Sequence, residues 1–120
     1  MLFGLSAFLG ALVWLLSPAL TGHREPWDAD SLFYHCGLFI AGFIPACFSA
    51  PRFWLWAIGA WLGQVLAFFV LLLRIQSGPL WPVGFLFLSL YALFSLAGAA
   101  LGACVHCFFR SHVSASTKVA

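Results

Sequence analysis

The sequence has very few charged residues: five Lys and Arg and three Asp and Glu in 120 residues, or 7% of the chain. Soluble domains carry about 25% charged residues. A chain that is 64% hydrophobic with so little charge cannot cover a water-facing surface and would expose large apolar patches. This low share of charged residues excludes a soluble domain. Because the sequence has no basic patch, it also argues against a nucleic-acid partner.

The sequence also lacks the alternating segments of about ten residues that a membrane β-barrel needs. It has instead apolar runs of about 20 residues, the length at which an α-helix crosses a bilayer. Four such runs are separated by the only charged or proline-rich stretches: about 2–20, 31–50, 53–73 and 83–109, with a tail at 110–120. We therefore predict a single all-α membrane domain over 1–120, an up-down bundle of four transmembrane helices. No positive charge precedes the first run, so we expect a mature helix rather than a secretory signal.

The few cations bear on orientation, because short cytoplasmic loops of membrane proteins are enriched in Lys and Arg. Four crossings would place Arg52, Arg110 and Lys118 on the side of both termini, and Arg24 and Arg74 on the other. This small bias predicts that both termini are cytoplasmic, in a bacterial-type cytoplasmic membrane.

Small residues recur at helical spacing in all four runs. Helices in lipid associate mainly through close packing of such residues and a few hydrogen bonds. Pro45 should kink the second helix near Ala41 by removing a backbone hydrogen bond. Gln64 lies mid-span, where an unpaired amide is costly, so we expect an interhelical hydrogen bond, with a substrate contact as the alternative. The small-residue faces are Ser6, Gly10 and Ser17; Gly42, Ala46 and Ser49; Gly59, Gly63 and Ala67; and Gly98 and Gly102.

Aromatic residues recur every seven positions in the third run, at Trp54, Trp61 and Phe68. Their spacing predicts a stripe on the side of the helix that faces away from Gly63. Trp54 fits an aromatic belt at the membrane–water interface, whereas Trp61 lies deeper. The stripe would face lipid or, alternatively, a partner helix, a quinone or a pigment.

The loop at 21–31 holds all three acidic residues. Asp28, Asp30 and Ser31 precede the second helix, where such residues cap the N-terminus and complement the helix dipole. The alternative is an outer cation or proton site, for which the loop has no recognisable metal spacing. That site would combine His23, Glu25, Asp28, Asp30 and His35. The candidates for docking another subunit are Arg24, Glu25, Trp27 and Asp28.

A CxxC pair, Cys104 and Cys107, lies near the inner end of the fourth helix. The pair is similar to that of the four-helix thiol–quinone oxidoreductases of the vitamin K reductase type, which need a second reactive pair on the outer side. Here Cys36 and Cys47 lie within the second helix, so no residue role is carried over. On a regular helix His106 points about 200° away from Cys104, which prevents the three from converging on zinc. We interpret the cysteines as free thiols that act as small apolar residues, with redox chemistry as the alternative.

Two histidines fall inside the predicted spans, where a histidine is a functional hypothesis by default. His35 lies one turn into the second helix and His106 one turn before the end of the fourth. These parallel helices would hold the histidines about 25–30 Å apart at 1.5 Å per residue, which excludes a bis-histidine haem. One haem or chlorin ligated by a single histidine is a possible cofactor. The alternative is a hydrogen-bonded interface histidine.

The sequence offers little for catalysis. No Asp, Glu, Lys or Arg lies in the core of a predicted span, and no HExxH motif, Ser–His–Asp arrangement or Gly-rich phosphate loop occurs. We assign no catalytic residue and expect a non-catalytic accessory or structural subunit that packs in the bilayer against other membrane subunits or a second copy. One alternative is a small-solute or ion transporter or channel component that acts as an oligomer through Gln64, Tyr91 and Ser95. Another is a haem, chlorin, quinone or thiol-redox protein.

Overall fold

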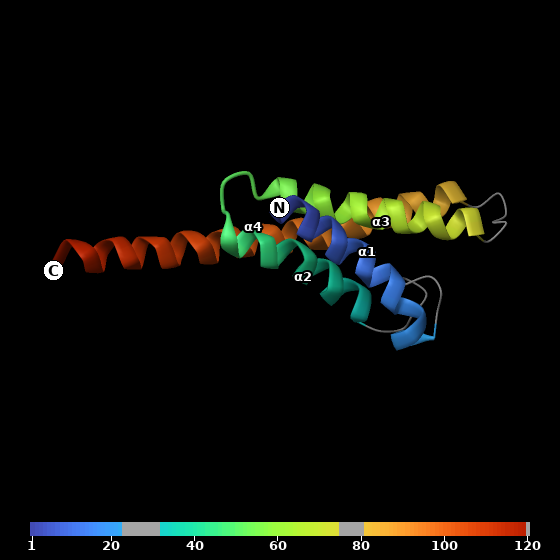
Figure 1. Ribbon diagram of the computed structural model, residues 1–120, viewed down its shortest axis with the longest axis horizontal. Helices are drawn as coiled ribbons and strands as arrows, with labels where there is room; N and C mark the ends of the chain where they lie inside the picture. The colour runs from blue at the N-terminus through green and yellow to red at the C-terminus, as the bar shows by residue number, and fades with distance from the viewer. Residues whose placement is uncertain (23–31, 75–80, 120) are drawn as a thin grey trace.

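The described residues of the computed structural model form four α-helices and no strand. The backbone is described at 1–22, 32–74 and 81–119, and side chains through Leu71 in the third helix and Ser114 in the fourth. The helices are α1 (Leu2–Thr21), α2 (Phe33–Phe48), α3 (Trp54–Arg74) and α4 (Trp81–Val119). They run alternately in opposite directions (Figure 1), so the prediction of an all-α, up-down arrangement is confirmed.

Three helices are long and apolar enough to cross a membrane, through the segments Leu2–Thr21, Trp54–Leu71 and Trp81–Ser114. Their length and composition fit a membrane protein. α2 has 16 residues, which rise about 24 Å against a hydrocarbon core of about 30 Å. It ends earlier than the predicted boundary at 50 because Pro51 lacks a backbone N–H and disfavours helical backbone at the residue before it.

α4 is longer than predicted. It has 39 residues, and the segment 110–120, which we expected to be a tail, is helical as far as Val119. After Gly102 the sequence has no glycine or proline that would end a helix. The last turns of α4 therefore extend beyond the other three helices at the end of the bundle where α2 finishes (Figure 1).

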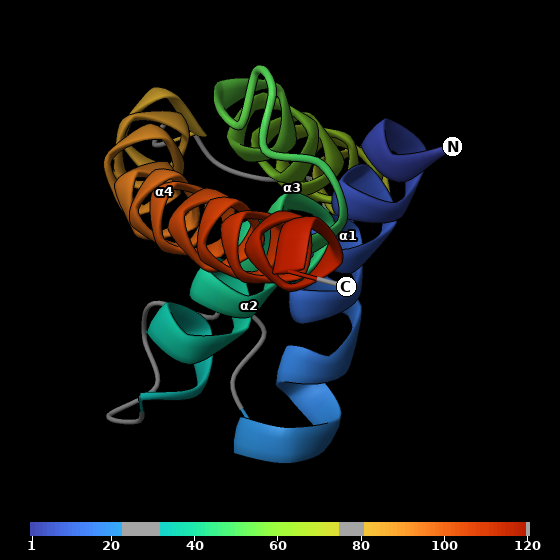
Figure 2. The same ribbon diagram turned by 90° about the vertical axis from the view of Figure 1, so that its left-hand side faces the viewer.

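The closest helix packing joins α1 with α3 and α2 with α4, rather than sequential neighbours. At five of the described glycines, an added Cβ would overlap a backbone carbonyl of the facing helix. Gly10 and Gly63 make these approaches between α1 and α3. Gly42, Gly98 and Gly102 make them between α2 and α4. The two pairs lie side by side in Figure 2. The predicted small-residue faces are thus confirmed, and each pair consists of parallel helices.

A serine of α1 compensates for the proline within α2. Pro45 has no N–H, so the carbonyl of Ala41 loses its helical donor. The hydroxyl of Ser6 donates to that carbonyl at 3.1 Å and also contacts the carbonyl of Trp56. Because Ser6 and Pro45 are both buried, this polar contact satisfies a carbonyl that water does not reach.

The predicted outward aromatic stripe of α3 is wrong for two of its three members. Trp54 is exposed, but Phe68 is buried and meets the Trp14 ring edge-on at 5.5 Å. Trp61 is half-buried and donates from Nε1 to the Ser89 hydroxyl of α4 at 3.3 Å. A seven-residue spacing places residues on one helix face, but it does not show which neighbouring helix covers that face.

Candidate functional site

The first candidate site is a polar pair inside the bundle. Gln64 of α3 is fully buried, and its side-chain oxygen accepts a hydrogen bond of 2.7 Å from the Tyr34 hydroxyl of α2. The expected interhelical hydrogen bond is therefore confirmed. Within the described part of the chain, the Gln64 amide nitrogen has no partner, which leaves its two N–H donors unsatisfied in the core.

The other predicted pathway residues, Tyr91 and Ser95, lie on α4. The ring centroid of Tyr91 is 5.0 Å from that of Tyr34. Ser95 is fully buried, its hydroxyl lacks a partner among the residues described, and its carbonyl faces Gly42. Gln64 and Tyr91 thus converge on Tyr34, whereas Ser95 belongs to the close contact between α2 and α4.

His35 packs among aromatic rings. Its ring centroid is 5.2 Å from that of Tyr91 and 4.7 Å from that of Phe94. Both contacts are edge-on and lie between α2 and α4. Its Nδ1 is buried and has no hydrogen-bond partner in the described structure. Ligation of a haem or chlorin by His35 stays a prediction.

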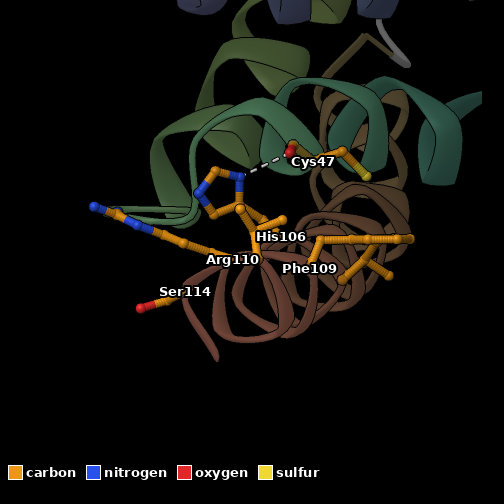
Figure 3. Close-up of a pocket in the computed structure, with 7 residues that line it drawn as sticks. Cys47, His106, Phe109, Arg110 and Ser114 are labelled. Carbon is orange, nitrogen blue, oxygen red and sulfur yellow. Dashed lines mark hydrogen bonds between the residues drawn. The ribbon is translucent and has the colours of Figure 1, made fainter. Parts of the chain in front are cut away.

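His106 caps the C-terminal end of α2. Its Nδ1 lies 2.8 Å from the carbonyl oxygen of Cys47 (Figure 3). Because a carbonyl only accepts, Nδ1 carries the proton. Cys47 is one of the last residues of α2, and Pro51, four positions later, has no N–H to donate back. The nearby Ser49 carbonyl accepts from Trp56 Nε1 at 2.9 Å, so α3 and α4 together cap α2.

The two histidines lie near opposite ends of α2. The residues between His35 and Cys47, the partner of His106, span about 18 Å along the helix. This separation is shorter than the sequence estimate, because His106 lies beside Cys47 rather than beyond the end of α2. It still places the two rings too far apart to ligate one iron.

An open groove of about 620 Å³ lies beside His106. It forms where α4 continues past the end of α2. Figure 3 shows Arg110 and Ser114 extending to the side of the second ring nitrogen of His106, with Phe109 on the opposite side. We call it the α2-end groove; its lining residues are Cys47, Val105, His106, Phe109, Arg110, Val113 and Ser114. Of these residues, only His106 was proposed as a site residue from the sequence.

A second groove, of about 440 Å³, lies between α3 and α4. Indole rings, small side chains and aliphatic side chains form its walls. We call it the α3–α4 groove; its lining residues are Trp54, Ala57, Ile58, Trp61, Ser89, Ala92, Leu93 and Leu96.

All four cysteines are free. Cys104 and Cys107 are exposed on α4, while His106 between them turns toward α2, as the helical period predicts. No group of three or more His, Cys, Asp and Glu within the described ranges could hold a metal ion. Redox chemistry at this pair stays a prediction.

The docking-loop candidates lie outside the described residues. They are Arg24, Glu25, Trp27 and Asp28.

Comparison with known proteins matches the chain to no family model, no curated protein and no solved structure.

Proposed function

We propose that the chain is a non-catalytic accessory subunit of a membrane protein complex, and that the α3–α4 groove binds one apolar helix of a neighbouring subunit. The observation that supports the proposal most directly is the composition of this groove. Two tryptophans border it, and Ala57 and Ala92 leave room between them. Small residues allow close approach of helices in lipid, and tryptophan is enriched at the energetic centre of protein interfaces.

Two polar groups of the groove, the Ser89 hydroxyl and the Trp61 indole N–H, already have partners. The Ser89 hydroxyl donates to the carbonyl of Phe85 at 3.0 Å and receives the Trp61 N–H. Because neither group needs a partner from outside, the groove offers an apolar surface. Such a surface favours an apolar helix over a polar solute.

The groove also has the length of a helix contact. Its lining runs from Trp54 to Trp61 on α3 and from Ser89 to Leu96 on α4, which is about two helical turns or 10 Å. A partner helix would place anchors there at positions i, i+3 or i+4, and i+7.

The test is copurification from the native membrane in mild detergent, with subunits identified by mass spectrometry. Ala92→Phe should fill the groove and remove a stoichiometric partner. Ala97→Phe is the matched control, because Ala97 is exposed on α4 but does not line the groove. A partner retained equally by both variants would contradict the proposal. So would a complex that native mass measurement shows to contain only copies of this chain.

A second candidate function, a transporter or channel component that acts as an oligomer, is supported by the buried amide nitrogen of Gln64, which is unpaired among the described residues. A polar group at this depth is costly and often marks a pathway. Solute flux into liposomes that contain only this chain, abolished by Gln64→Leu, is the expected result. Flux that Gln64→Leu leaves unchanged would exclude Gln64 from a pathway.

A further inference from the structure

We infer that the α2-end groove binds the phosphate headgroup of an anionic phospholipid from the surrounding bilayer. This inference needs a membrane around the bundle, but it does not depend on the accessory-subunit function.

The depth of the groove matches the headgroup region. The apolar run of α4 ends at Phe109, and Arg110 is the first charged residue after it. Arginine near the end of a membrane helix extends to the interface. α2 ends at Phe48, close to Arg110 along the bundle axis. The groove therefore opens where the bundle meets the headgroup region.

One wall can hold a phosphate. His106, Arg110 and Ser114 follow each other at four-residue spacing, which places them on one helix face. Arg110 and Ser114 are exposed and extend to the same side in Figure 3. A guanidinium presents several N–H donors that match phosphate oxygens, and a hydroxyl adds one more. The groove lining has one permanent cation and no carboxylate.

The other wall can hold an acyl chain. Val105, Phe109 and Val113 repeat at the same spacing one position earlier, and Phe109 points away from Arg110 (Figure 3). Phe109 and Val113 are 64% and 67% exposed. A free phosphate would make no favourable contact with this apolar wall, whereas a lipid has both a charged headgroup and an apolar acyl chain. The pairing of the two walls therefore favours a lipid.

The end of α2 does not oppose an anion as a bare helix terminus would. The C-terminal end of a helix carries partial negative charge on its unpaired carbonyls. Here the Cys47 and Ser49 carbonyls accept hydrogen bonds from His106 and Trp56. These caps reduce the repulsion of a phosphate beside Arg110.

The test is native mass spectrometry of the full chain in detergent, titrated with phosphatidylglycerol or with phosphatidylcholine. We expect tighter binding of phosphatidylglycerol, reduced about fivefold in Arg110→Gln, since one Arg near an anionic surface contributes about 1 kcal/mol. Arg52→Gln is the matched control. Arg52 is exposed in the turn that follows α2, at the same end of the bundle, but does not line the groove. Its variant should bind phosphatidylglycerol like the wild type.

A second variant, Ser114→Glu, keeps the test independent of how Arg110→Gln folds. It adds a negative charge to the polar wall and should also weaken phosphatidylglycerol binding. Equal loss in Arg110→Gln and Arg52→Gln, or equal binding of the two lipids by the wild type, would overturn the inference. Displacement of phosphatidylglycerol by millimolar inorganic phosphate would also overturn it, because the site would then take a small anion.

Discussion

The imidazole of His106 on α4 and the carbonyl of Cys47 on α2 form a hydrogen bond of 2.8 Å between helices distant in sequence. The bond supplies the donor that Pro51 lacks. It also fixes the point at which α4 leaves the end of α2, and thereby shapes the α2-end groove.

His106→Phe should lower the free energy of unfolding by about 1–3 kcal/mol, because it keeps a ring but leaves the Cys47 carbonyl unpaired. Unfolding in a mild detergent, followed by circular dichroism, measures the change. His112→Phe is the control, since His112 is exposed and contacts only the neighbouring Phe108 ring among the contacts described. Equal loss in both variants would show that the Cys47 bond contributes nothing.

Ser6→Ala should destabilise the wild type by about 1–3 kcal/mol, since the Ala41 carbonyl then has no donor. In a Pro45→Ala background the cost should shrink, because an alanine in place of the proline restores the backbone N–H that reaches Ala41. A double-mutant cycle on unfolding free energies measures this coupling. Strict additivity of the two substitutions would refute the compensation of Pro45 by Ser6.

Gly98→Val should cost about 1–3 kcal/mol or more, as overpacking does, because its side chain would overlap the Phe39 carbonyl. Gly4→Val is the control, since an added Cβ there meets nothing within 4 Å. Thermal unfolding in detergent compares them. Similar melting temperatures for the two variants would mean that α2 and α4 can separate at little cost.

Much of this packing could be expected from the sequence, because in lipid small residues and a mid-span amide serve mainly to bring helices together. The faces around Gly63 and Gly98 and the hydrogen bond of Gln64 follow from that constraint. Which helices pair does not follow, since GxxxG spacing identifies a face but not its neighbour. For the same reason the prediction that Trp61 and Phe68 face outward was wrong.

The α2-end groove was missed for a different reason. Arg110 and the polar residues after it suggest a water-exposed tail, and a change in polarity is easily taken for the end of a helix. The absence of glycine and proline after Gly102 was the available signal that α4 continues. The contribution of Cys47 could not be foreseen, because it depends on where α2 ends relative to α4.

Both termini should lie on the same side of the membrane, and the Lys and Arg bias predicts the cytoplasm. Reporter fusions at each terminus, active only on one side of the membrane, test this. The shortness of α2 makes the experiment decisive: termini on opposite sides would mean that α2 does not cross.

The unbroken course of α4 has a mechanical consequence. A twist or pull applied near Val119 would reach the segment that packs against α2 without meeting a glycine or proline to absorb it. The projecting turns therefore form a rigid extension of α4. A molecule that binds them in the aqueous phase would turn or tilt the part of α4 that lies within the lipid.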